Sequence, residues 1–211
     1  MLADDKYIFR ITHIDNISHI LEFGITHKNS SNSNPNYRPI GDSTLINKRA
    51  TFELDNGRYL GDYIPFYFGQ RSPMQFVIER GHNGVNTVKA NEILYCVSSI
   101  NKVLESQIPF IYTDGHATDR LTKFYSSSEV LEINKHVDFD AVKAKNWADW
   151  ANPEDLDLKR RKEAELLLGA DLDCNLIVGF VVRYDFVKAE LIEKYKLEEK
   201  QIAVRSNFYY D

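Results

Sequence analysis

Residues 158–168 bring together residue types that could do chemistry. The basic run Lys159-Arg160-Arg161-Lys162 is followed at once by two carboxylates, Glu163 and Glu165, and then by an apolar segment. A carboxylate at the start of an apolar element can be partly desolvated, which raises its proton affinity and makes it a usable base near neutral pH. The four cations beside it would attract an anionic substrate. A solvated helix with ordinary charge pairs is the alternative, and these eleven residues alone favour it.

The overall composition indicates one domain, spanning residues 1–211. The chain has a mass of 24.5 kDa and is 43% hydrophobic and 12% aromatic, so a substantial core can form. A net charge of -5 counts against a general DNA-coating protein but leaves room for a local basic groove. Cys96 and Cys174 each lie in an apolar run, which favours free thiols in a reducing, cytoplasmic setting.

Several common classes of site and segment have no signature in the chain. No Cys/His spacing resembles a zinc site, so we expect no metal. Neither a Gly-x-Gly-x-x-Gly fingerprint nor a P-loop lysine motif is present, so the usual nucleotide motifs are missing. No apolar stretch reaches 18 residues and no secretory leader is recognisable at the start, so we expect no membrane contact.

Short apolar segments must position the candidate residues. Strand patterns occur at residues 7–12, 63–68, 93–97, 108–113, 175–183 and 202–209. Helical spacing occurs at 14–23 and 187–197, and residues 75–79 suit either a strand or a helix. Because strands and helices do not alternate regularly, we expect an α+β fold with packed mixed sheets. Pro65 within its strand predicts a sheet edge or a bulge.

Four further places in the chain carry polar residues for which the sequence leaves the role open. Residues 28–41 are rich in Asn, Ser and Pro and predict a long exposed loop, either a functional lid or a disordered tip. Lys48 and Arg49 belong either to a short charged turn or to a clamp for a phosphate or carboxylate. His13 ends the first strand, where it is either a surface residue or a donor at a ligand's rim. The turn Thr113-Asp114-Gly115-His116 could carry a site.

Five motifs in this order resemble the DarT family of DNA ADP-ribosyltransferase toxins, over residues 9–209. The Tyr-Pro-aromatic block with its Arg-Ser-Pro-Met sequence is the most telling of them. The motifs are His13-Ile14-Asp15-Asn16-Ile17, Lys48-Arg49-Ala50, residues 62–68 with Arg71-Ser72-Pro73-Met74, Thr113-Asp114-Gly115-His116-Ala117, and Ala164-Glu165 after the basic run.

The resemblance implies an ADP-ribosyltransferase fold, with two small mixed or antiparallel sheets forming an NAD cleft and helices at the periphery. It implies transfer of ADP-ribose from NAD onto thymine or guanine of single-stranded DNA, with release of nicotinamide. It also implies a bacterial or phage-encoded toxin and a cognate macrodomain-type antitoxin. Loop 28–41 would cover the cofactor.

The resemblance also assigns roles to particular residues. Glu165 and Arg49 would be catalytic, and relatives often carry Gln at the position of Glu163, so the role of Glu163 is open. The residues expected at NAD are His13, Asn16, Arg49, Tyr67 and His116. Lys159, Arg160, Arg161 and Lys162 are expected to bind the nucleic acid.

The residue types suit this reaction. Cleaving the nicotinamide–ribose bond builds positive charge on the ribose, which a nearby glutamate stabilises. The same glutamate can take the proton of the attacking base nitrogen. Two alternatives remain: a transferase of the same fold that acts on RNA or protein, and a non-catalytic nucleic-acid-binding module.

Overall fold

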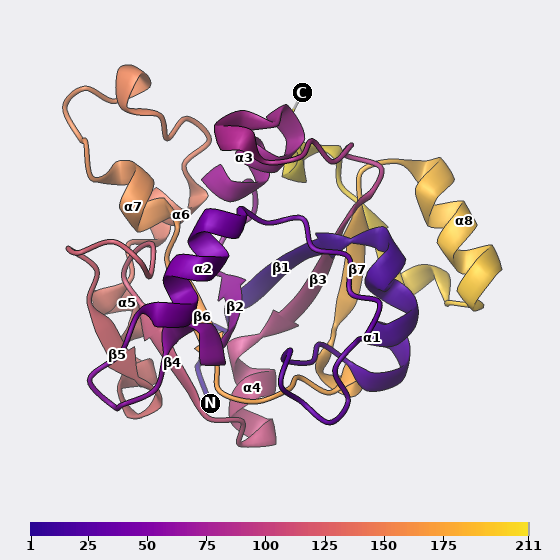
Figure 1. The fold of residues 1–211 in the computed structure, drawn as a ribbon, viewed down its shortest axis with the longest axis horizontal. Helices are drawn as coiled ribbons and strands as arrows, with labels where there is room; N and C mark the ends of the chain where they lie inside the picture. The colour runs from indigo at the N-terminus through magenta and orange to yellow at the C-terminus, as the bar shows by residue number, and fades with distance from the viewer. Residues whose placement is uncertain (211) are drawn as a thin grey trace.

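The computed structural model describes residues 1–210, and these residues form an eight-stranded sheet with helices on both faces (Figure 1). The strand order is β5-β4-β6-β2-β1-β3-β7-β8, antiparallel except for the β7–β8 pair. The strands are β1 (Tyr7–His13), β2 (Ile64–Tyr67), β3 (Ile93–Ser99), β4 (Phe110–Thr113), β5 (Phe124–Ser126), β6 (Glu165–Leu168), β7 (Gly179–Val182) and β8 (Ile202–Val204). The helices are α1 (Ile17–Phe23), α2 (Ser43–Thr51), α3 (Pro73–Arg80), α4 (Ile100–Ser106), α5 (Ile133–His136), α6 (Phe139–Lys143), α7 (Leu158–Lys162) and α8 (Asp185–Tyr195). The α+β class is confirmed.

The expected pair of sheets is in fact one sheet with two halves. Strands β5-β4-β6-β2 form one half and β1-β3-β7-β8 the other. The register that joins the halves is a single pair, Phe9 on β1 opposite Tyr67 on β2. Beyond that pair β1 and β2 diverge, and the sheet opens as a wedge. The prediction of two separate sheets was therefore wrong in number, because this one pairing joins them.

Pro65 lies at the opening of this wedge. It pairs in register with Leu167 of β6 on one side. On the other side its carbonyl accepts a hydrogen bond from Arg10 Nη1, at 2.9 Å. Proline has no N–H to donate to a ladder, so it suits a strand whose second neighbour has moved away. The prediction of an edge strand was wrong, since β2 is interior; the open side is local to Pro65.

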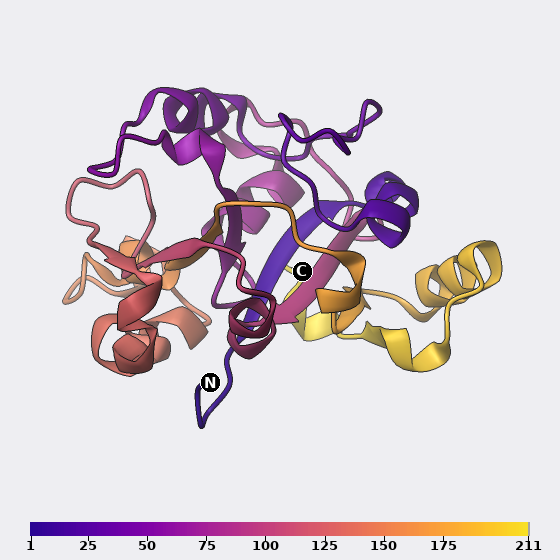
Figure 2. The same cartoon turned by 90° about the horizontal axis from the view of Figure 1, so that it is seen from below.

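Alternating residues of the strands supply two faces of the core. On one face Ile8, Phe66, Leu166 and their neighbours pack with α4 and α8. On the other face the core is divided: one cluster around Phe9 packs with α3, and another around Leu167 packs with the segment before β2. Figure 2 shows α4 on the opposite side of the sheet from α2 and the 28–41 loop. The side chains of the candidate site, such as Arg49 and His116, lie over this divided face of the sheet.

Several local expectations changed in the folded chain. Residues 75–79 are helical, because Ser72 caps α3 and Pro73 stands at its first position. The strand expected over 175–183 is only β7, preceded by a 3-10 turn that Asp173 caps. The last strand ends at Val204, after which Tyr209 turns into the core. The longest helix of residues 1–210 has 11 residues, and none could span a bilayer.

Candidate active site

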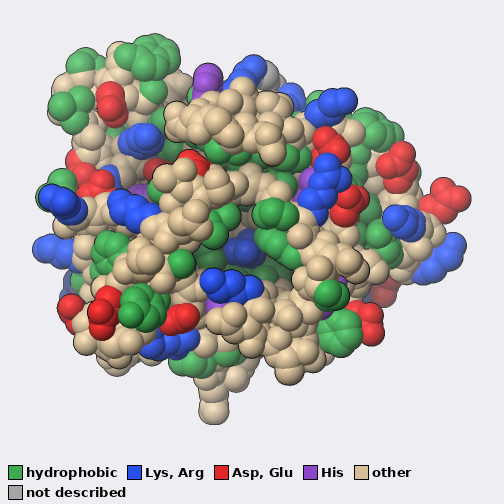
Figure 3. Space-filling view, in the orientation of Figure 1, with side chains coloured by type: hydrophobic (Ala, Val, Ile, Leu, Met, Phe, Trp, Pro, Cys, Tyr) green, Lys and Arg blue, Asp and Glu red, His purple; other side chains and the backbone are tan. Residues whose placement is uncertain are grey.

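A pocket of about 560 Å³ occupies the wedge between the two halves of the sheet. Its floor comes from β1 and β2, and its walls from α1, α2 and the 28–41 loop. Four of the residues expected at NAD line it: Asn16, Arg49, Tyr67 and His116. Figure 3 shows the pocket as the hollow in the middle of this face, with basic and hydrophobic side chains around it.

Glu165 is the first residue of β6 and is fully buried. Its Oε2 accepts a hydrogen bond from Arg49 Nη1 at 2.9 Å, and its Oε1 is 3.3 Å from the same nitrogen. Its Oε1 also accepts the backbone N–H of Ala117, at 3.0 Å. Glu165 does not itself line the pocket, so Arg49 stands between this carboxylate and the cavity.

Arg49 lies on α2, not on the charged turn that was one interpretation of its segment. Asp42 caps this helix by accepting the N–H groups of Thr44 and Leu45. Gly61 lets the next segment approach α2 closely, because a Cβ there would come within 2.9 Å of the Ala50 Cα. Among the described residues, Arg49 Nη2 is buried and has no hydrogen-bond partner.

An unpaired buried donor costs free energy unless a ligand satisfies it. Arg49 therefore has one nitrogen committed to Glu165 and a second available to a bound acceptor. Arg49 can therefore connect the Glu165 carboxylate to a ligand bound in the pocket.

The turn after β4 supplies two groups to the site. His116 lines the pocket, and its Nδ1 lies 3.1 Å from Thr118 Oγ1. The next residue, Ala117, gives the amide that holds Glu165. The resemblance had pointed to His116, while the contribution of the Ala117 backbone has no signature in side-chain types.

His13 and Asn16 lie at the end of β1 but serve different places. His13 is 1% exposed and does not line the pocket. Its Nδ1 accepts the N–H of Asp15, and burial lowers the pKa of its imidazole despite the nearby carboxylates. Asn16 lines the pocket, yet its amide holds the long loop: it accepts the Arg38 N–H and donates to the Arg38 carbonyl, both at 2.9 Å. The resemblance had implied an NAD contact for both residues, and for both that contact stays a prediction.

The second carboxylate, Glu163, is buried beside the site and is 6% exposed. Burial is the main cause that raises its pKa, and the charge of Glu165 adds to it, while His116 and Lys159 oppose it. Tyr67, opposite Glu165 on β2, has its pKa raised by burial and then by the charges of Glu165 and Glu163. Negative charge thus concentrates around β6, and Arg49 meets it from the pocket side.

The basic run forms α7, and its four members have different environments. Lys159 is exposed. Arg160 is paired with Asp114 and Asp157, and Arg161 with Asp138, Asp155 and Asp157. Lys162 is buried, its Nζ donates to the Val142 carbonyl, and burial lowers its pKa to about 8. The run is therefore not an open cationic surface; DNA contact stays a prediction, with Lys159 its most accessible member.

Arg10 is a charged residue of the pocket that the sequence analysis did not single out. Arg10 lies within β1 and lines the cavity while its Nη1 bonds the Pro65 carbonyl. A cation in the middle of an otherwise apolar strand is uncommon, and that was the available signal. No group of His, Cys, Asp and Glu in residues 1–210 is arranged to hold a metal ion.

Comparison with protein families matches residues 9–210 to the family described as ssDNA thymidine ADP-ribosyltransferase, DarT. The chain is 31% identical to a DNA ADP-ribosyl transferase of Escherichia coli O127:H6, covering 96% of this chain and 93% of that protein. A Thermus sp. DNA ADP-ribosyl transferase is also 31% identical, covering 96% and 95%. A Thermosipho africanus fusion of such a transferase with a DNA ADP-ribosyl glycohydrolase is 26% identical, covering 84% of this chain and 42% of that protein.

Solved structures share the fold. Thermus sp. 2.9 DarT in complex with ADP-ribosylated ssDNA superimposes with a TM-score of 0.82 at 30% identity, covering 97% of this chain and 96% of that one. The same protein in complex with NAD+ superimposes with a TM-score of 0.79, covering all of both chains.

Proposed function

The chain belongs to the DarT family, and on that premise we propose that it transfers ADP-ribose from NAD+ to a base of single-stranded DNA. The observation that carries the proposal is the Glu165–Arg49 pair at the pocket. It joins a buried carboxylate to a guanidinium whose second nitrogen has no partner among the described residues. The NAD+ and ADP-ribosylated ssDNA complexes of the Thermus relative support it.

The residues of the pocket fit NAD+. A cavity of about 560 Å³ is within the range of small-molecule sites, roughly 300–1,000 Å³. A dinucleotide brings a diphosphate and many acceptor oxygens, which suit the unpartnered Arg49 Nη2 and the nearby Arg10 guanidinium. The 28–41 loop forms one wall, and Asn16 and Asp171 tie down its two ends. These anchors would hold the loop over the bound dinucleotide.

The chemistry assigned to the site is a displacement at the ribose. The bond between nicotinamide and ribose C1 breaks, and nicotinamide leaves with the bonding electrons as a neutral molecule. A new bond forms between C1 and a ring nitrogen of the base, and the proton of that nitrogen passes to Glu165. The Glu165 carboxylate also stabilises the positive charge that builds on the ribose.

Arg49 and the Ala117 amide have orienting roles in this scheme. Together they hold both oxygens of Glu165, so the carboxylate needs little reorganisation before it acts. Arg49 Nη2 would bind an acceptor of NAD+ or of the base, which places the substrate against the carboxylate it must reach. His116 would contact the substrate from the turn that also carries Ala117.

We expect thymine as the target base, because the family's description names thymidine; guanine is the competing outcome. Single strands present their bases unpaired, which avoids the cost of extruding a base from a duplex. The Thermosipho relative carries a DNA ADP-ribosyl glycohydrolase in the same chain. A separate macrodomain-type glycohydrolase antitoxin, acting with this chain as a toxin in the bacterial cytoplasm, is therefore part of the proposal.

The test uses purified protein, NAD+ and short oligonucleotides that contain one thymine or one guanine. We expect mass spectrometry to show one added ADP-ribose on the thymine oligonucleotide, with fragmentation placing it on the base, and equimolar nicotinamide. Matched RNA and a protein extract test the alternative acceptors. NAD+ binding without any product would favour a non-catalytic module.

A further inference from the structure

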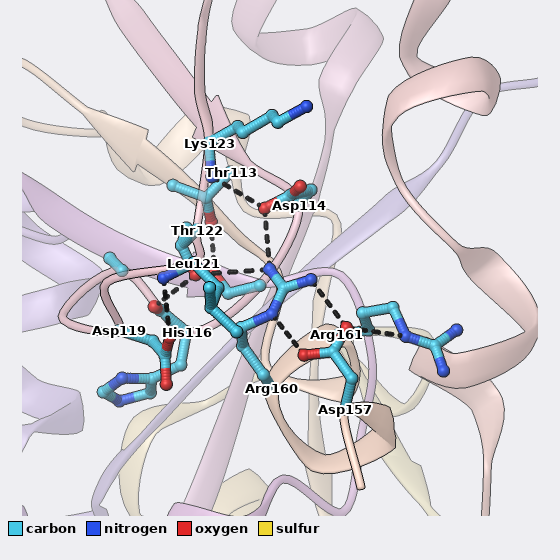
Figure 4. Close-up of polar contacts among 12 residues, drawn as sticks. Thr113, Asp114, His116, Asp119, Leu121, Thr122, Lys123, Asp157, Arg160 and Arg161 are labelled. Atoms are coloured by element: carbon cyan, nitrogen blue, oxygen red, sulfur yellow. Dashed lines mark hydrogen bonds and ion pairs between the residues drawn. The ribbon is translucent and has the colours of Figure 1, made fainter. Parts of the chain in front are cut away.

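Arg160 is built into the interior between α7 and the turn at residues 113–118. All three nitrogens of its guanidinium donate to other side chains (Figure 4). Nε and Nη2 bond the two oxygens of Asp157 at 2.6 and 2.8 Å, and Nη1 bonds Asp114 at 2.9 Å. The side chain is 12% exposed. With two carboxylates already on this guanidinium, it is poorly placed to serve a DNA phosphate.

The backbone of Arg160 also shapes the turn. Its carbonyl accepts the N–H of His116 at 2.9 Å. Gly115 packs directly on it: a Cβ at this glycine would lie 2.4 Å from Arg160 Nη1 and 2.9 Å from the Arg160 carbonyl oxygen. Thr122 closes the arrangement, since its hydroxyl donates to the His116 carbonyl and lies 3.4 Å from Arg160 Nη1. The 113–118 turn therefore packs against both the backbone and the guanidinium of Arg160.

The same turn holds the carboxylate of the site. Ala117 donates its N–H to Glu165 Oε1, and His116 faces the pocket. At the start of the turn, Thr113 Oγ1 accepts the N–H of Glu165 and donates to the Gly115 carbonyl. Arg160 is thus connected to Glu165 through the 113–118 turn by a continuous series of hydrogen bonds and close packing contacts.

We propose that Arg160 is a positioning residue for the transfer reaction, which holds the 113–118 turn so that Ala117 orients Glu165 and His116 faces the pocket. The inference rests on the proposed function for its catalytic part. The planar guanidinium is a rigid fork of donors that reaches Asp114 and both oxygens of Asp157 with three hydrogen bonds. A lysine ammonium is a compact charge on a flexible stem and does not reproduce that geometry. Arg160→Lys therefore keeps the charge and removes the bridge.

The kinetic test compares Arg160→Lys with wild type, and Arg205→Lys is the matched control at an exposed arginine that directly follows β8. For Arg160→Lys we expect kcat to fall about 10-fold or more, because small misplacement of a reacting group has large effects. KM for the oligonucleotide and its dependence on salt should not change. Arg205→Lys should behave as wild type.

A DNA-contacting arginine would give the opposite pattern. KM would rise with kcat intact, and the slope of log affinity against log salt would fall by about 0.7 for one lost contact to a single strand. That outcome would overturn the proposal. Asp114→Ala removes the oxygen that accepts from Arg160 Nη1 and should reproduce the loss of kcat.

A second measurement does not depend on turnover. Amide hydrogen exchange should become faster at His116 and Ala117 in Arg160→Lys, while the amides of β6 stay protected as in wild type. Unchanged exchange at the turn would overturn the proposal even if activity fell. An inactive wild type would refute the proposed function, and the exchange data would still decide whether Arg160 holds the turn.

Discussion

Replacing Glu165 by Gln tests the central role of this carboxylate with almost no change in shape. The carboxylate has two oxygens, and both are in use: Oε1 accepts the Ala117 N–H, and Oε2 accepts Arg49 Nη1 at 2.9 Å. If the glutamine oxygen takes the first place, its NH₂ group faces the Arg49 nitrogen, donor against donor. The variant therefore loses one charge-assisted hydrogen bond and the negative charge together.

The structural cost can be bounded from that single bond. A hydrogen bond to a charged group contributes about 1.5–3 kcal/mol, so we expect the free energy of unfolding to fall by about 2 kcal/mol. For a domain of this size that corresponds to a decrease in Tm of about 4–8 °C. The protein should still fold at 25 °C.

The effect on turnover should be much larger than the effect on stability. General-base help alone is worth about 10²–10⁴-fold, and the variant also loses the charge opposite the developing cation. We expect the rate of ADP-ribosylation of a thymine oligonucleotide to fall at least about 10³-fold, measured by mass spectrometry under single-turnover conditions.

Glu163→Gln is the matched control, two residues away in the same buried segment. Because burial raises the pKa of Glu163 and many relatives are expected to carry Gln there, it should retain most of the wild-type turnover. A Glu165→Gln variant that keeps more than a tenth of the rate, or the reverse order of the two variants, would refute the assignment.

Three other predictions follow from the same contacts. Arg49→Lys should lower turnover about 100-fold, as for the loss of one preorganised donor, because one ammonium cannot bond Glu165 and also reach the pocket. Its circular dichroism spectrum should be unchanged, and normal kinetics in this variant would remove Arg49 from the site. Asn16→Ala should raise KM for NAD+ and speed proteolytic cleavage within residues 28–41, because the loop loses its bonds to Arg38; an unchanged KM would mean that the loop needs no anchor at that end. Lys162 has a pKa of about 8 in the folded chain, below its ordinary value of 10.5. Between pH 8 and 10.5 the unfolded chain therefore binds more protons than the folded chain, so the free energy of unfolding should rise with pH in that window. Chemical denaturation of Lys162→Met at several pH values should show a flatter rise.

The elements that follow a simple period were predictable. The strand ending at His13, the helix of α1 with Gly24 after it, the 28–41 loop and the helix of α8 all agree with the sequence patterns. Their signals are local: apolar alternation, helical spacing, and a glycine at positive φ after the last turn. The class α+β followed from the same patterns.

The pairing of the strands was not predictable in this way. Nothing in the separate segments shows that Phe9 meets Tyr67, because that contact joins residues far apart in the chain. The resulting wedge decides where the pocket lies, and it explains how Pro65 is accommodated in an interior strand. The pairing also shows why two sheets were a reasonable but wrong expectation.

By itself the sequence determined which chemical groups are available. These are a glutamate, Glu165, that stands between a basic run and an apolar segment, the Arg49 guanidinium in a polar segment, and the histidines His13 and His116 near the ends of two strands. Their division of labour was decided only by tertiary structure. Arg160 and Arg161 meet carboxylates brought from distant segments, Lys162 is buried, and a backbone amide at Ala117 holds Glu165. The physical reason is that charge is a property of a residue, whereas burial and partners depend on which parts of the chain fold against it.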